Sequence, residues 1–299
     1  MKINIVEVGP RDGFQSVKEF IPTETKIEII EGLVEAGVKK IQAGSFVSPK
    51  AIPQMKDAKD IFQYFLEKYK NSDIEFFALV PNLKGAENAY NAGVRKVSYV
   101  ISVSEYHNKA NVNKTLDESF AELEKIIQEF PDLKIGLDAA TTFGCPFGGE
   151  VSLDSVLAYI ERAYRLGIRE FNICDTIGVA YPTQVEQTVK ALLDKYNDCI
   201  FDIHIHDTRN MGMVNTLIAI QNGVFNVQTA LGGLGGCPFA PGASGNTSTE
   251  DLVYMLEKMN ISTNVDFNKL IKIAKKQKEK VYGNYSGHHI NIEKGSCNS

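Results

Sequence analysis

Two histidines separated by a single residue carry the strongest chemical signal in the sequence. His204 and His206 end an apolar run typical of a strand, Asp202-Ile203-His204-Ile205-His206-Asp207. Side chains two residues apart on a strand point to the same side, so the two imidazoles face together. Paired imidazoles at the end of a strand are good ligands for a divalent metal. The alternative is a pair of core histidines with satisfied hydrogen bonds, and the pairing favours the metal.

A carboxylate and a guanidinium stand side by side after the first predicted strand. Arg11 and Asp12 lie in the segment Glu7-Val8-Gly9-Pro10-Arg11-Asp12-Gly13-Phe14-Gln15. Asp12 could bind a cation and Arg11 an anion. Taken alone, the segment fits equally well a surface ion pair that caps a turn.

A glycine-rich segment follows the last predicted strand, Leu231-Gly232-Gly233-Leu234-Gly235-Gly236-Cys237-Pro238. Its glycines predict a mobile loop whose backbone can approach a ligand. Cys237 could be a nucleophile or proton donor, or an inert small residue. Asn246 offers a neutral oxygen to a metal, and residues 247–251 begin a helix whose N-terminus can hold an anion.

Further polar residues follow other predicted strands. Asp175 comes after the sixth strand and could orient a ligand or a loop. Lys50 comes after the second strand and could meet a phosphate, although a solvated lysine fits as well. His107 is expected in a loop, and His288 and His289 are expected to be solvated.

Alternating strands and helices must position these residues. The sequence predicts strands at 3–8, 40–44, 74–80, 96–102, 134–140, 170–173, 200–205 and 226–229. It predicts helices at 23–36, 54–69, 83–92, 116–128, 153–166, 183–196, 212–222 and 249–259. Several helices end in one recurrent phrase, as in Glu35-Ala36-Gly37-Val38 and Asn91-Ala92-Gly93-Val94, where a glycine with positive φ can turn the chain into the next strand.

This alternation predicts an α/β protein with a (β/α)8 (TIM) barrel at residues 1–260. A doubly wound sheet has the same alternation. Residues 261–299 are expected to form a C-terminal extension, with a helix at 268–281 and a flexible tail beyond it.

Composition narrows the class of function. The chain has 299 residues, 43% hydrophobic and 23% charged, which is ordinary globular usage. The net charge of −5 gives no reason to expect nucleic acid. No apolar run approaches the ~18 residues of a membrane helix. The five cysteines are odd in number and widely spread, so we expect a reducing cytoplasm rather than a disulfide framework.

Taken together, the ordered motifs resemble the 3-hydroxy-3-methylglutaryl-CoA lyase family of metal-dependent TIM-barrel carbon–carbon lyases. The resemblance runs from the first strand to about residue 280. The matching segments are Val6-Glu7-Val8-Gly9-Pro10-Arg11-Asp12-Gly13, Ser45-Phe46-Val47-Ser48-Pro49-Lys50, Pro81-Asn82-Leu83-Lys84-Gly85, Phe143-Gly144-Cys145-Pro146, Asp175-Thr176-Ile177-Gly178-Val179, His204-Ile205-His206-Asp207-Thr208 and Gly232-Gly233-Leu234-Gly235-Gly236-Cys237-Pro238.

The resemblance implies one divalent cation, Mg2+ or Mn2+, held by Asp12, His204, His206 and Asn246. It implies retro-aldol cleavage of a 3-hydroxy acyl-CoA, first of all 3-hydroxy-3-methylglutaryl-CoA to acetyl-CoA and acetoacetate. Arg11 would stabilise the enolate and Cys237 would protonate it. His204 would also transfer a proton, and Asp175 would support the polar cage. A homodimer is the expected assembly.

Three departures from the family pattern concern the substrate. Gln42 stands where the lyases carry a glutamate and cannot move a proton. Asp138 stands near an aromatic position, and Arg209 adds a cation. The predicted substrate-binding set is Gln15, Gln42, Ser45, Lys50, Asp138 and Arg209.

These departures leave open a related aldol-type lyase or condensing enzyme acting on a different acyl-CoA or a 2-oxo acid. Two other classes are disfavoured. A non-enzymatic barrel would not need the set of metal ligands with Arg11 and Cys237. A zinc hydrolase would need a nucleophile elbow or a glutamate base, and neither is found at suitable spacing.

Overall fold

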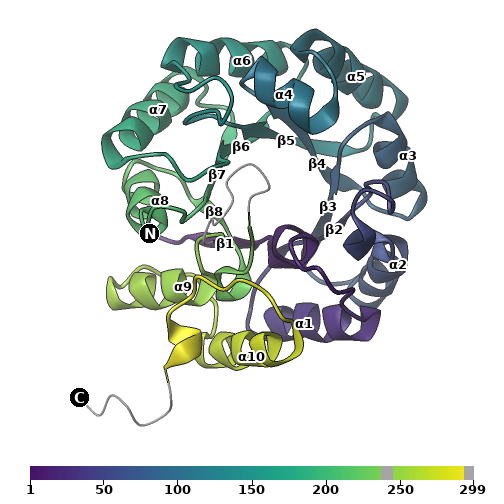
Figure 1. Cartoon of the computed structure of the whole chain (residues 1–299), viewed down its shortest axis with the longest axis vertical. Helices are drawn as coiled ribbons and strands as arrows, with labels where there is room; N and C mark the ends of the chain where they lie inside the picture. Colours follow the sequence, from purple (N-terminus) through teal and green to yellow (C-terminus); the bar gives the residue numbers. More distant parts are fainter. Residues whose placement is uncertain (237–244, 293–299) are drawn as a thin grey trace.

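The strands of the chain close into a barrel (Figure 1). The computed structural model describes residues 1–236 and 245–292. Every strand is parallel to its neighbours, and β8 pairs back with β1. The strands are β1 (Asn4–Glu7), β2 (Lys40–Ser45), β3 (Glu75–Val80), β4 (Lys96–Ser102), β5 (Lys134–Ala140), β6 (Glu170–Asp175), β7 (Ile200–Ile205) and β8 (Asn226–Thr229). The (β/α)8 prediction is confirmed, and the open doubly wound sheet is excluded.

Helices surround the barrel and cover the outer faces of its strands (Figure 1). They are α1 (Thr23–Glu35), α2 (Ala58–Lys68), α3 (Leu83–Asn91), α4 (Glu105–Val112), α5 (Leu116–Glu129), α6 (Leu153–Arg165), α7 (Pro182–Lys195), α8 (Gly212–Gln221), α9 (Thr249–Lys258) and α10 (Phe267–Lys280). Single helical turns occur at η1 (Gly9–Gly13), η2 (Pro53–Met55), η3 (Leu231–Gly233) and η4 (His289–Asn291). No helix within residues 1–236 and 245–292 combines the length and apolar character that crossing a membrane requires.

The recurrent glycine phrase does what its composition predicts. Gly37, Gly93, Gly167 and Gly223 all have φ between 92° and 103° and follow the ends of α1, α3, α6 and α8. A side chain with a Cβ rarely adopts this conformation, so glycine ends each helix and turns the chain toward the next strand.

Helix α4 was not predicted from the sequence. His107 was expected in a loop, but it lies in α4 and is buried, with Nδ1 2.6 Å from the Ser102 hydroxyl. The helix is short and mostly polar, so it lacks the apolar periodicity that reveals longer helices. The predicted helix at 54–69 is also divided, because a turn at η2 precedes the start of α2.

The C-terminal helix and the residues after it pack on the barrel. Glu28 of α1 forms ion pairs with Lys276 and Lys280 of α10. Residues 282–292 of the expected tail contact the barrel, and Tyr285 forms a backbone bridge with Leu234. His289 is not simply solvated either, because its Nδ1 lies 2.6 Å from an Asp251 carboxylate oxygen.

Candidate metal centre and active site

Three potential metal ligands converge at the carboxyl-terminal end of the barrel strands. Asp12 lies in η1, directly after β1, while His204 lies in β7 and His206 directly follows it. One ligand atom from each residue lies within 4.8 Å of the other two, and all three side chains are buried. The imidazole rings are 5.0 Å apart between centroids, so the two histidines face together as the strand periodicity predicts.

Asn246 completes this group from the segment that precedes α9. Its backbone forms a bridge with His206, and its side-chain amide donates to Asp12 Oδ2 over 2.9 Å. Asn246 Oδ1 and the Nδ1 atoms of both histidines are buried, and no hydrogen-bond partner is found for them among the described residues. Buried polar atoms normally have partners, so these atoms are available to coordinate a metal ion. One carboxylate, one amide oxygen and two imidazoles suit a divalent cation.

The electrostatics of the cluster favour the metal-binding protonation states. Burial alone would raise the pKa of Asp12, but Arg11, the two histidines and the Asn246 amide outweigh it and hold that pKa at about 2. Burial, together with His206, lowers the pKa of His204 to about 3. At neutral pH Asp12 is therefore an anion and His204 a neutral imidazole, as coordination requires.

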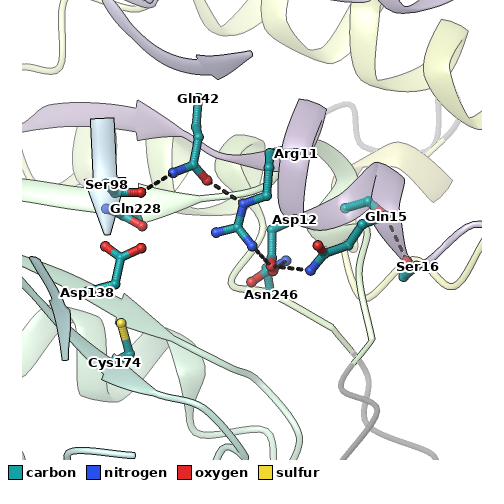
Figure 2. A network of polar contacts seen from close by, with 12 residues as sticks. Arg11, Asp12, Gln15, Ser16, Gln42, Ser98, Asp138, Cys174, Gln228 and Asn246 are labelled. Carbon is teal, nitrogen blue, oxygen red and sulfur yellow. Dashed lines mark hydrogen bonds and ion pairs between the residues drawn. The ribbon is translucent and has the colours of Figure 1, made fainter. Parts of the chain in front are cut away.

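Arg11 connects the ligand cluster to the barrel interior. Its Nη1 donates to Asp12 Oδ1 and its Nε donates to Gln42 Oε1, each over 2.5 Å. Gln42 in turn donates to the Ser98 hydroxyl over 2.8 Å (Figure 2). Gln15 also donates to Asp12 Oδ1, over 3.0 Å. Arg11 is only 9% exposed, so its positive charge is fixed beside the cluster and is little screened by water.

Asp138 is a buried residue of β5 that lies close to Ser98 (Figure 2). Asn172 donates to Asp138 Oδ1 over 3.2 Å and to Gln228 Oε1 over 3.0 Å. Burial raises the pKa of Asp138 to about 6, although Arg11 and the hydrogen bonds from Asn172 and Ser98 oppose the change. A buried carboxyl with this pKa can accept a hydrogen bond or, when protonated, donate one.

The comparisons with known proteins match this architecture over nearly the whole chain. A family model described as HMGL-like matches residues 2–276. The chain belongs to the HMGL-like family. The resemblance inferred from the motifs is therefore confirmed, as is the assignment to the carbon–carbon lyases.

Two curated relatives of this HMGL-like chain bear different substrate names. Hydroxymethylglutaryl-CoA lyase YngG of Bacillus subtilis is 40% identical over 297 residues, covering 99% of this chain and 98% of its own. The (R)-citramalyl-CoA lyase of Chloroflexus aurantiacus is 40% identical over 278 residues, covering 90% and 88%. A solved HMG-CoA lyase from Acinetobacter baumannii, in complex with coenzyme A and 3-methylmalate, superposes with a TM-score of 0.91 at 37% identity, covering 99% and 96%.

Two residues predicted at the site of this HMGL-like chain hold a loop in place. Asp175 accepts hydrogen bonds from the backbone of Val179 and Ala180, over 2.9 and 3.0 Å. Arg209 donates to the carbonyl oxygens of Ile177 and Gly178, over 3.1 and 2.8 Å. Both side chains therefore hold the loop between β6 and α7, and one nitrogen of the Arg209 guanidinium is hydrogen-bonded to backbone carbonyls.

The other residues predicted at the site are Ser45, Lys50 and Cys237. The Ser45 hydroxyl is buried at the end of β2, and no partner is found for it within the described part of the chain. Lys50 is exposed in the loop after β2. Cys237 lies outside the described residues, so its predicted role stays a prediction.

Glu7 is a buried residue next to the site for which the sequence suggested no role. It is fully buried and accepts hydrogen bonds from the backbone of Gly9 and Leu231 and from the Thr249 hydroxyl. Burial raises its pKa to about 7. A glutamate at the end of an otherwise apolar strand was the available signal. It ties η1, which carries Arg11 and Asp12, to the glycine-rich segment.

A second buried glutamate makes the stability of the protein depend on pH. Burial raises the pKa of Glu250 from the ordinary 4.5 to about 8. The folded state therefore binds a proton that the unfolded chain releases, and stability falls as pH rises from about 4.5 to 8. We expect Glu250→Gln to flatten this slope and to stabilise the protein at about pH 8.5 by a few kcal/mol relative to the native chain. Urea unfolding of metal-free protein across this range measures the effect.

The matched control is Glu257→Gln, an exposed change on the same helix, which should leave the slope intact. Some slope should persist in Glu250→Gln because Glu7, with a pKa of about 7, titrates in the same window. An unchanged slope in Glu250→Gln would mean that Glu250 is ionised in the folded protein at neutral pH.

Proposed function

We propose that this chain cleaves 3-hydroxy-3-methylglutaryl-CoA to acetyl-CoA and acetoacetate, using Mg2+ or Mn2+. The observation that carries the proposal is the buried cluster of Asp12, His204 and His206, with Asn246 and Arg11 against it. The names of the relatives agree with this reaction, and coenzyme A is bound in the Acinetobacter baumannii relative.

The chain's own residues divide the reaction between them. A bound divalent cation would supply Lewis acidity that makes the substrate's 3-hydroxyl more acidic. As the hydroxyl loses its proton, the C2–C3 bond breaks, C3 becomes a ketone carbon and the bond's electron pair passes to the thioester fragment as an enolate. Arg11 is fixed by Gln42 and Asp12, so its charge faces the developing enolate without reorganisation. His204 is proposed to accept the proton of the 3-hydroxyl, and Cys237 to protonate the enolate carbon.

A second candidate substrate follows from the barrel interior. Asp138 and Gln42 place a carboxyl and an amide in the barrel interior near Arg11. A substituent of the acyl group would be recognised there. An ionised Asp138 repels a substrate carboxylate and favours a hydroxyl donor. A related 3-hydroxy acyl-CoA with a different polar substituent is therefore the alternative, and a relative of 40% identity bears the name of another such substrate, (R)-citramalyl-CoA. We also propose that the substrate contacts the other residues predicted to bind it, which are Gln15, Ser45, Lys50 and Arg209.

The deciding experiment is a parallel assay of the purified chain with both thioesters and with Mg2+ or Mn2+. Products are identified by mass spectrometry. Formation of acetyl-CoA and acetoacetate supports the main proposal, whereas turnover of citramalyl-CoA alone supports the alternative. Absence of product from both thioesters, with metal bound, would reject both.

The substitution Gln42→Glu tests whether a carboxylate base at position 42 speeds the reaction. Gln42 accepts from Arg11 and donates to Ser98, so a glutamate keeps the first contact and reverses the second. We expect kcat for 3-hydroxy-3-methylglutaryl-CoA to rise about tenfold, because a carboxylate can take a proton and a positioned base contributes ~10²–10⁴-fold. Steady-state kinetics at saturating metal provide the measurement.

Gln42→Ala is the control, because it removes the amide without supplying a base and should lower kcat. If Gln42→Glu is no faster than the native chain, the amide contacts to Arg11 and Ser98 are already the productive ones.

We also propose a catalytic domain at residues 1–260 with an extension at 261–299, and a homodimer in the cytoplasm. The widely spread cysteines and the net charge of −5 support this setting, with neither nucleic acid nor membrane as partner. Light scattering of the eluted protein distinguishes a dimer from a monomer.

A further inference from the structure

The C-terminal segment lies across the glycine-rich segment that leads toward the active site. Tyr285 forms a backbone bridge with Leu234, and the Gly287 amide donates to the Gly232 carbonyl over 2.9 Å. The Ser286 hydroxyl lies 2.9 Å from the Asn246 carbonyl oxygen and 3.2 Å from that of Gly233. Residues 285–289, here called the C-terminal clamp, therefore contact both the glycine-rich segment and the backbone of Asn246.

Two glycines owe their identity to this contact. Gly232 and Gly233 have φ of 71° and 62°. A Cβ on Gly232 would lie 2.6 Å from the Tyr285 ring, and one on Gly233 would lie 2.0 Å from the Ser286 hydroxyl. These glycines permit close packing against the clamp. The glycine-rich segment is thus held by the clamp at residues 231–236.

The clamp is itself anchored to the start of α9. Asp251 accepts the backbone amides of His288 and His289, over 2.7 and 3.0 Å, and lies 2.6 Å from His289 Nδ1. The His289 ring also packs on Tyr254, with 4.4 Å between centroids. Helix α9 begins only a few residues after Asn246. This anchor therefore holds the clamp in place relative to the proposed metal ligand.

We propose that the C-terminal clamp is a positioning device for the metal centre, with Ser286 holding the Asn246 backbone and His289 holding the clamp on α9. The neighbours of Asn246 are also held by the end of β7 and the residues after it, because the Asp207 amide donates to the Gly245 carbonyl and the Thr247 amide donates to the Ile205 carbonyl. Only Ser286 reaches Asn246's own carbonyl from the tail side among the described contacts. The inference rests on the proposed metal site and adds the tail residues that shape it.

The test is the Mn2+ affinity of the full chain, measured by electron paramagnetic resonance of free Mn2+. Residues that orient metal ligands from outside the coordination sphere typically change affinity ~10–100-fold, so we expect Ser286→Ala to raise the Kd about tenfold. His289→Ala should raise the Kd in the same direction. Amide hydrogen exchange at residues 231–236 should also quicken in both variants. The metal-free thermal midpoint separates loss of folding from loss of positioning.

Tyr282→Ala is the matched control, because Tyr282 is 92% exposed in the same segment, and its Kd should equal that of the native chain. A Kd unchanged in both Ser286→Ala and His289→Ala, with Asn246→Ala clearly weakened, would overturn the clamp and leave the metal site standing. A Kd unchanged in Asn246→Ala would instead reject the proposed site, and the clamp with it. If Ser286→Ala does not fold, His289→Ala carries the test.

Discussion

His206→Ala is expected to abolish both divalent-metal binding and turnover. Its imidazole belongs to a buried group whose ligand atoms lie within 4.8 Å of one another, and its backbone pairs with Asn246. Lewis-acid stabilisation is worth several kcal/mol, and each 1.36 kcal/mol is tenfold in rate, so kcat should fall about 10³-fold or more. Mn2+ titration and the acetoacetate assay measure the two losses.

Metal-free native protein is the reference for this variant. His206→Ala should resemble the native chain treated with a chelator, both in residual activity and in thermal midpoint, and added Mn2+ should restore only the native chain. Native-like turnover in His206→Ala would show that catalysis does not depend on this cluster.

The sequence could predict the metal cluster because its members follow simple rules. A period of two places His204 and His206 on one side of β7, whatever the rest of the fold does. A closed barrel then gathers the residues that follow β1 and β7 at one end, which places Asp12 beside them. Asn246 is harder, because it follows the glycine-rich segment, and only the resemblance to a family singled it out.

The polar network inside the barrel could not be predicted in this way. Gln42, Ser98, Asp138, Asn172 and Gln228 come from five strands, and each of these strands carries other polar residues as well. Which of them meet depends on strand register, and one strand's sequence does not contain it. In the structure Asp138 pairs with Asn172 and His204 with Gln228.

The contacts of the C-terminal tail could not be predicted for a different reason. Its glycine, asparagine and serine residues have the composition of a solvated loop, and its contacts join groups far apart in the chain. Ser286 lies 40 residues from Asn246 and 53 residues from Gly233. Polar contacts of this kind leave no periodicity in the sequence, so composition alone does not reveal the contacts of the clamp.

Replacing Arg11 with methionine is expected to leave the metal bound but to lower kcat about 10²–10³-fold, the cost of removing a preorganised donor from a developing oxyanion. Arg11 is the positive side chain bonded to both Asp12 and Gln42, so its loss removes charge from the enolate's surroundings. Asp12 keeps its contacts with Gln15 and Asn246, so Mn2+ affinity should change much less than kcat. Single-turnover kinetics at saturating Mn2+ provide the measurement.

Arg11→Lys separates charge from geometry at this position. A lysine keeps the charge but cannot reproduce the fork that contacts Gln42 and Asp12 together, so kcat should fall between those of Arg11→Met and the native chain. If Arg11→Met instead loses Mn2+ affinity in proportion to kcat, Arg11 acts by holding Asp12 for the metal. The ratio of the two losses therefore decides whether Arg11 is a catalytic residue or a positioning residue.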